Sequence, residues 1–380
     1  MTSPAAPVEF DLPSPRAAAE PPEARGLARD EVRLLVAGPG VIRHARFRDL
    51  AAHLRAGDVV VVNDSPTMPA ALDVVRGAGP ATVHLSTRLD DGDWIVELRP
   101  PDRMGPLRDG TRGEQFAVAG GKRSGVTQPA TFTLLTPDSG DTGDDGVRLW
   151  RAGFETPVPV SRFLDQEGRP IRYGYVPHRW PLAAYQTIFG RRRRHTFASA
   201  EMASAARPFT PELVDDLRRN GVKFASITLH AGVSSLEAHE PPRPERFEVS
   251  SRTAGIVNRA RRLGHRAIAV GTTVTRALES AADPDGTIIP AAGWTGLLLD
   301  GTRPANTIDG LITGWHPPMA SHLRLLEAVA GPELVTSAYR AAAAAGYLWH
   351  EFGDSCLFLP NLQREGSAPR PPWSGFAGLL

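Results

Sequence analysis

The sequence predicts an α/β fold in which a small antiparallel β domain is inserted into a main α/β domain. Two buried strands, at residues 224–230 and 266–270, each run into a loop of small and polar residues, and a helix follows the second loop. Between residues 72 and 153 the pattern changes to short alternating runs separated by Gly- and Asp-rich turns. With 380 residues and 41% apolar composition, the chain can bury the cores of two domains. We therefore divide it into residues 1–71 and 154–380, which form the α/β domain, and the insert at 72–153.

The first part of the α/β domain begins after a lead-in, rich in Ala and Pro, that contains Phe10-Asp-Leu-Pro13. An apolar run at residues 32–36 predicts a strand, and apolar residues at helical spacing predict a helix over 47–54, which Gly57 closes. The unbroken valines at 59–62 are typical of a strand covered on both faces. This strand ends in the polar loop 63–65.

The insert contains four alternating runs, at residues 81–86, 93–98, 131–135 and 147–150, which favour a small antiparallel barrel or sandwich. Its turn at 137–146 carries four aspartates. The turn lacks the Glu that closes an EF-hand loop, so we interpret it as a solvated acidic turn rather than a calcium loop.

The second part of the α/β domain follows a connector rich in Pro, Arg and Tyr and a run of four arginines at 191–194 beside His195. That run is either a phosphate contact or an exposed loop. Thr210-Pro-Glu212 is an N-cap signature that opens a helix, and Gly221 closes it. Beyond the two central strands, the pattern predicts strands at 296–299, 308–312 and 355–359 and helices at 274–281, 321–329 and 332–345.

Composition excludes several classes of protein. The net charge of +1 gives no global basic field, so any contact with nucleic acid has to be local. The single cysteine, Cys356, forms no internal disulfide and no Cys-rich zinc site, and its apolar surroundings indicate a buried small side chain. No apolar stretch approaches 18 residues and no leader pattern is present, so we expect a cytoplasmic protein without a membrane contact. The oligomeric state is open between monomer and homodimer.

Common cofactor motifs are missing from the sequence. Gly121-Lys122 is followed by Arg123 and makes no P-loop, and Gly38-Pro-Gly40 lacks the third glycine of a dinucleotide fingerprint. The segment His350-Glu-Phe-Gly-Asp354 lacks the second His of a zinc helix. We expect no metal.

The candidate site is instead a set of polar residues that flank the predicted strands. His230 and His316 each follow an apolar strand, and Asp309, Glu245 and the Gly271-Thr-Thr273 loop complete a polar cluster suited to acid–base chemistry. The carboxyl ends of parallel strands meet at one edge, and the free N–H groups of the following helix favour a negative charge there. Arg276 either pairs with Glu279 along its helix or reaches a ligand carboxylate.

Several segments, in this order along nearly the whole chain, resemble the S-adenosylmethionine:tRNA ribosyltransferase-isomerase family of the queuosine pathway. They are Phe10-Asp-Leu-Pro13, Phe47-Arg-Asp-Leu50, residues 57–64, Tyr185-Gln-Thr-Ile-Phe189, residues 209–213, Thr228-Leu-His-Ala-Gly232, residues 269–273 with 276–280, Asp309-Gly-Leu-Ile-Thr313 and Phe352-Gly-Asp354. The resemblance implies an α/β domain with an inserted β-barrel.

The resemblance also implies an activity. A base removes a proton from the ribose 5′ carbon beside the sulfonium of S-adenosylmethionine, adenine and methionine leave, and the rearranged unit ends on an aminomethyl-deazaguanine in the anticodon region of tRNA. On this basis His230, His316 and Asp309 are acid–base candidates. The candidates for binding S-adenosylmethionine are Asp64, Gly232, Gly271, Thr272, Thr273 and Arg276.

The chain departs from the family pattern at Pro66, Ala71, Pro208, Arg243 and Gly314-Trp315, where the family carries other residues. These departures leave alternatives: an enzyme that uses a small-molecule acceptor, one that only cleaves S-adenosylmethionine, or a non-catalytic binding protein on the same fold.

Overall fold

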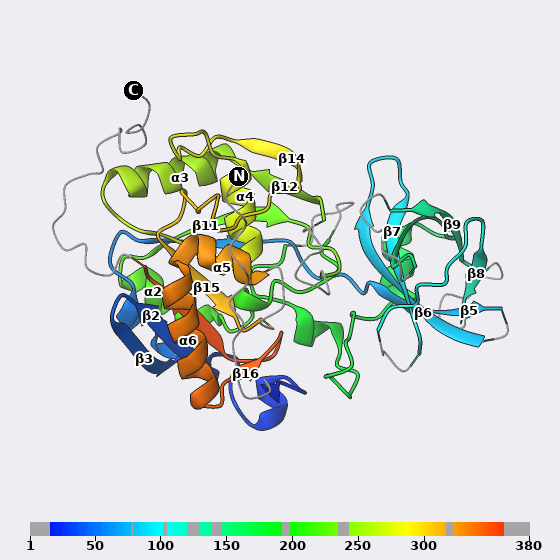
Figure 1. Ribbon diagram of the computed structural model, residues 1–380, viewed down its shortest axis with the longest axis horizontal. Coiled ribbons are helices and arrows are strands. Elements are labelled where there is room, and N and C mark those ends of the chain that lie inside the picture. The colour runs from blue at the N-terminus through cyan, green and yellow to red at the C-terminus, as the bar shows by residue number, and fades with distance from the viewer. Residues whose placement is uncertain are drawn as a thin grey trace.

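Figure 1 shows the computed structural model, in which an α/β domain and a β-barrel lie side by side. The structure describes residues 16–77, 79–101, 105–119, 129–138, 146–191, 198–234, 243–316 and 322–360. The lead-in at residues 10–13, most of the acidic turn, and residues 192–195 of the arginine run and its histidine lie outside the described residues.

The α/β domain is built on one mixed sheet, which contains nine strands among the described residues. Their order across the sheet is β14 (Ala291–Thr295), β12 (Glu245–Val249), β11 (Lys223–Leu229), β4 (Val59–Asn63), β13 (Ala267–Val270), β15 (Gly310–Gly314), β17 (Ser355–Phe358), β2 (Arg33–Gly38) and β3 (Val41–Arg46). The neighbours β11, β4, β13 and β15 run parallel. Their carboxyl ends therefore share one edge of the sheet.

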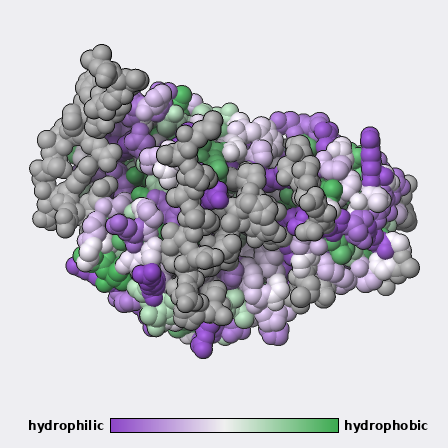
Figure 2. Space-filling model, in the orientation of Figure 1, coloured by the Kyte–Doolittle hydropathy of each residue, from purple (hydrophilic) through white to green (hydrophobic). Residues whose placement is uncertain are grey.

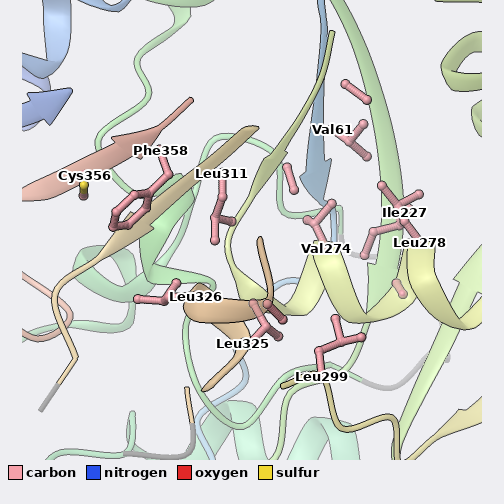
Figure 3. Packing of buried hydrophobic residues seen from close by; sticks show 14 of the residues in the cluster. Val61, Ile227, Val274, Leu278, Leu299, Leu311, Leu325, Leu326, Cys356 and Phe358 are labelled. Atoms are coloured by element: carbon pink, nitrogen blue, oxygen red, sulfur yellow. The ribbon is translucent and has the colours of Figure 1, made fainter. Parts of the chain in front are cut away.

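The valines of β4 explain why this strand is central. Val59 and Val61 belong to the core on one face, and Val60 and Val62 to the core on the other. The first core lies under α3 (Ser251–Arg262), α4 (Thr272–Ser280), α5 (His322–Ala330) and α6 (Pro332–Ala344), and Figure 3 shows Val274 and Leu278 of α4 close to Val61 and Ile227. The second core lies under α2 (Pro211–Arg219) and the 3-10 helix η3 (Phe47–His53). Cover on both faces is what an unbroken β-branched strand requires.

The insert is a closed barrel. Its strands among the described residues are β5 (Ala71–Arg76), β6 (Gly79–Arg88), β7 (Trp94–Arg99), β8 (Gln115–Val118), β9 (Thr131–Pro137) and β10 (Leu149–Glu155), and every neighbouring pair is antiparallel. Of the two folds that the alternating runs favoured, the insert is therefore the barrel and not the sandwich. After β10 the chain returns through α1 (Val160–Glu167) and irregular segments to the α/β domain.

Most of the elements expected from the sequence are present, and a few differ. The predicted N-cap is confirmed, because Thr210 Oγ1 accepts from Leu213 N at 3.2 Å. The predicted helix at 47–54 is a 3-10 helix, and the strand expected at 296–299 is wrong, since β14 ends at Thr295. Cys356 is buried, as predicted.

The surface agrees with a protein that keeps its apolar residues inside. On the face shown in Figure 2, hydrophobic residues that are not covered by grey atoms lie scattered among hydrophilic ones. The exposed large apolar side chains among the described residues are Val75, Ile188, Leu263, Ile289 and Leu298. No helix of the described residues has the length and apolar composition needed to cross a bilayer.

Candidate active site

A cavity of about 440 Å³ lies at the edge where the parallel strands end. Three loops that follow these strands line it, at residues 231–234, 270–273 and 313–316. Arg99 at the end of barrel strand β7, the irregular segments 171–175 and 200–205, and the turn at 350–351 complete its wall. The cavity is thus formed by both domains.

The beginning of α4 supplies backbone donors to this cavity. Gly271 has a φ of 92° and links β13 to α4 with no side-chain cap, and its N–H donates to Ile312 O at 2.8 Å. Thr272 and Thr273 form the first turn and line the cavity. The N–H groups of a first helical turn have no partner within the helix and point toward an anion placed there.

The same cavity wall contains two parallel imidazole rings, those of His316 and His322. The rings of His316 and His322 stack with their centroids 4.6 Å apart, and Thr313 Oγ1 lies 3.2 Å from His316 Nε2. Burial lowers the pKa of His316 well below its ordinary value, and burial together with the charge of Arg276 lowers the pKa of His322 to about 4. Both rings are therefore neutral at neutral pH, and the lowered pKa makes each a weaker base than an ordinary histidine, while neutral rings stack and form hydrogen bonds readily.

Arg276 lines the cavity, but its donors are used within the protein. It forms an ion pair with Glu245 and donates to Leu297 O, Thr295 O and Arg243 O. Glu279, the partner considered from the sequence, instead accepts from Asn306 and Thr307. The pairing of Arg276 with Glu279 is therefore wrong, whereas contact of Arg276 with a ligand carboxylate stays a prediction, and the observed bonds hold the loops around the cavity.

Gly232 lies at one of the contacts between the barrel and the α/β domain. A Cβ at this position would lie 2.6 Å from Ser86 Oγ and 2.9 Å from Thr87 Oγ1, both on β6. The neighbouring Val233 N donates to Ser86 Oγ at 3.0 Å. Only glycine permits this approach.

Three predicted site residues do not line the cavity. Asp309 precedes β15 and accepts from Ala267 N at 3.0 Å, which puts it at the amino ends of the strands, the opposite edge of the sheet. Asp64 is buried and accepts from Ser226 and Thr228. His230 adjoins the cavity loop, but its Nδ1 lies 2.8 Å from Ser65 Oγ. The structure therefore gives no support to these three as ligand contacts.

Two carboxyl groups that sequence reasoning missed lie in the cavity wall. Glu201 accepts from the Tyr173 hydroxyl and from both the N–H and the hydroxyl of Ser234. Glu351 accepts from the Tyr175 hydroxyl. Burial raises the pKa of both carboxyls, that of Glu351 to about 7, although these hydrogen bonds act to lower it. The sequence shows the connector that carries Tyr173 and Tyr175, but it has no hydrophobic periodicity from which its position at the cavity could be predicted.

A buried charged cluster lies behind the wall. Glu97 of β7 pairs with Arg99 and with Arg148, whose Nε is 2.6 Å from the carboxylate, and all three residues are buried. Arg148 also donates to Ser234 O at 2.7 Å, and Arg99 lies over the Tyr173 ring at 5.0 Å. The cluster thus connects the barrel to the groups that hold Glu201.

No group of three His, Cys, Asp or Glu residues suited to a metal ion occurs among the described residues. The fold defines this protein as an α/β protein with an inserted barrel, and its cavity lies at the carboxyl ends of parallel strands, where open α/β sheets commonly bind ligands. The model of the queuosine biosynthesis protein family matches residues 6–358, and the chain belongs to that family.

Relatives from several bacteria support this membership. The S-adenosylmethionine:tRNA ribosyltransferase-isomerase of Symbiobacterium thermophilum is 34% identical over 92% of this chain and 98% of its own length. That of Moorella thermoacetica is also 34% identical, with the same coverage. A crystal structure of S-adenosylmethionine tRNA ribosyltransferase from Thermotoga maritima matches with a TM-score of 0.49 and 26% identity, covering 93% of this chain and all of that one.

Proposed function

We propose that this enzyme transfers the ribosyl part of S-adenosylmethionine to an aminomethyl-deazaguanine base in the anticodon region of tRNA and isomerises it, releasing adenine and methionine. The observation that carries the proposal is the cavity at the start of α4, formed by both domains of a chain that belongs to the queuosine biosynthesis family. The reaction takes place where tRNA is found, in the cytoplasm.

The chemistry sets out what the site must provide. The sulfonium makes the 5′ carbon of the ribose acidic, so a base can remove a proton there, and the leaving groups must be held in place. S-adenosylmethionine carries a carboxylate, an adenine ring and two cationic groups. The cavity has to offer one contact for each of these and room for the acceptor base.

We assign the donor side of the cavity to the loops around α4. The N–H groups and hydroxyls of Thr272 and Thr273 are placed to donate to an anion such as the methionine carboxylate, and Gly271, whose N–H donates to Ile312 O, forms the turn that positions them. The neutral His316–His322 stack and the apolar side chains of residues 297–299 suit an aromatic base. Gly232 and Arg276 act on the same side by holding the loops in place.

The proposal is tested by incubating the purified protein with S-adenosylmethionine, with and without tRNA that carries the aminomethyl-deazaguanine. We expect adenine and methionine, measured by chromatography, only when the modified tRNA is present, and a mass increase on the modified nucleoside after digestion. Release without tRNA contradicts transfer to tRNA, and absence of release with both substrates contradicts the enzymatic proposal.

The donor site is tested separately by Thr272→Val, which keeps the side-chain shape and removes the hydroxyl. Loss of one neutral hydrogen bond corresponds to roughly a threefold to tenfold rise in the Kd for S-adenosylmethionine. Thr302→Val is the matched control, because Thr302 is exposed and does not line the cavity. Equal Kd values for the two variants would show that the Thr272 hydroxyl does not contact S-adenosylmethionine.

A further inference from the structure

The tyrosine-bearing wall of the cavity carries two carboxyl groups without a cationic partner. Among the described residues, Glu201 and Glu351 take part in no ion pair and are held by hydroxyl and N–H donors alone. Carboxyl groups are costly to bury without a positive charge nearby, and buried ones are normally paired. Glu201 and Glu351 are half-buried in one cavity wall, an arrangement that suits a positive charge supplied by a ligand.

The arginines of the same wall do not supply that charge. Arg99 is paired with Glu97, and Arg276 with Glu245. Arg243 forms an ion pair with Asp138 of the barrel. Each of these guanidinium groups is thus committed to another carboxylate, and neither Glu201 nor Glu351 lies within salt-bridge distance of a cation in the described part of the chain.

Aromatic rings surround the two carboxyls. The Tyr173 and Tyr175 rings stack with centroids 6.0 Å apart, and His350 stacks on Tyr175 at 4.1 Å. His350 has a φ of 68°, the one positive value for a non-glycine residue in the described chain. Such a conformation costs free energy and occurs where the surrounding structure requires it, often at functional sites. Here it belongs to the turn that carries Glu351 into the cavity wall.

Resting on the proposed function, we propose that Glu201 and Glu351, with Tyr173 and Tyr175, form the subsite that binds the primary amine of the acceptor base as an ammonium group. Carboxylates accept its N–H donors, and the faces of the aromatic rings attract its charge. The amine must lose one proton before its nitrogen can form a bond to carbon. One carboxylate takes that proton and becomes a carboxylic acid, and the nitrogen keeps the electron pair of the broken N–H bond as its lone pair.

S-adenosylmethionine, the donor, also carries positive charges, but the contacts of Glu201 and Glu351 favour binding of the acceptor amine. The donor carboxylate is assigned to the start of α4, and its own ammonium lies on the adjacent carbon. The carboxylate bonded to α4 is Glu245, through Arg276. Both Glu201 and Glu351 instead accept hydrogen bonds from tyrosines of the connector between the barrel and the α/β domain. Glu201 also accepts one from the loop after β11.

The test uses Glu201→Gln and Glu351→Gln, which remove the charge and keep the shape. We expect each variant to raise the KM for tRNA bearing the aminomethyl-deazaguanine at least tenfold, while the Kd for S-adenosylmethionine changes less than twofold. The same tRNA with an unmodified guanine, which lacks the amine, should bind wild type and variants equally. Glu333→Gln is the matched control, since Glu333 is an exposed residue at the start of α6.

Each outcome decides the matter. Weaker binding of S-adenosylmethionine, with an unchanged KM for the tRNA, would assign the carboxyls to the donor and overturn the inference. An unchanged KM and Kd would overturn it as well. Glu351→Asp should restore part of the lost discrimination between amine-bearing and guanine tRNA, which a structural role alone does not predict. If wild type itself releases no adenine, the proposed function fails, whereas discrimination in tRNA binding still tests the subsite.

Discussion

Removal of the charge on Glu97 should destabilise the protein strongly. The carboxylate is fully buried, and Arg99, Arg148 and His84 surround it with side-chain exposures of 3–4%. Burial alone would raise the pKa of Glu97, but His84, whose Nδ1 lies 3.5 Å from the carboxylate, and the charges of Arg148 and Arg99 hold it well below its ordinary value. Glu97→Gln removes the carboxylate that Arg99 and Arg148 share, and loss of one partner of a buried pair costs about 3–5 kcal/mol.

The assay is urea unfolding followed by circular dichroism at several pH values. Because the folded-state pKa of Glu97 is lowered, its stabilisation is present above the ordinary glutamate pKa and is lost as pH falls toward the folded-state value. The difference between wild type and Glu97→Gln should therefore be full at pH 7 and shrink below pH of about 4.

The control is Asp91→Asn on the same barrel, which breaks an ion pair with Arg151. Both side chains of that pair are largely exposed, at 52% and 40%, so the variant should cost less than about 1 kcal/mol. A cost for Glu97→Gln as small as that of the control, or one that does not depend on pH, would refute the reasoning. Since Arg148 also donates to Ser234 O, Glu97→Gln should raise the KM for tRNA too.

Three further predictions concern the cavity. Because the folded-state pKa of Glu351 is raised to about 7, the wild type loses about 3 kcal/mol of stability as pH rises from the ordinary glutamate pKa to that value, so the Tm of Glu351→Gln relative to wild type should rise over this range and level off above it; parallel curves would contradict this. Gly232→Ala places a Cβ 2.6 Å from Ser86 Oγ and should cost about 1–3 kcal/mol in urea unfolding, whereas Gly255→Ala, with open space around its Cβ, should not. Arg276→Lys loses the bonds to Leu297 O and Thr295 O and should weaken binding of S-adenosylmethionine in calorimetry, and unchanged affinity would show that the loops need no such support.

Strands in the centre of the sheet could be predicted because they consist of consecutive apolar residues, which are buried on both faces. All residues of β4 and β13 are buried, and an unbroken run of apolar residues of this length favours a strand that is covered on both faces of the sheet. The edge strand β3 and the next-to-edge strand β12 were missed because they mix exposed arginine or glutamate with apolar residues, and their pairing is decided by the neighbouring strands.

The position of the loops that we assign to the donor could be predicted for a topological reason. Gly271 to Thr273 and His316 follow parallel strands, and the carboxyl ends of such strands meet. The same rule explains the error at Asp309, since a residue that precedes a strand lies at the other edge. His230 is at the correct edge, but the alternation along β11 places it on the face of Ser226 and Thr228, where it meets Ser65.

The acceptor side could not be predicted, because its residues come from segments without periodicity that only the closed structure brings together. A chain of contacts runs from Glu97 through Arg148 to Ser234, from Ser234 to Glu201 and Tyr173, and from the Tyr173 ring to Arg99, which returns to Glu97. Two of the arginines in this ring belong to the barrel, and Ser234 belongs to the loop after β11. The barrel is therefore part of the site: without it, the α/β domain would keep the groups assigned to the donor and lose the support of the carboxyls assigned to the acceptor amine.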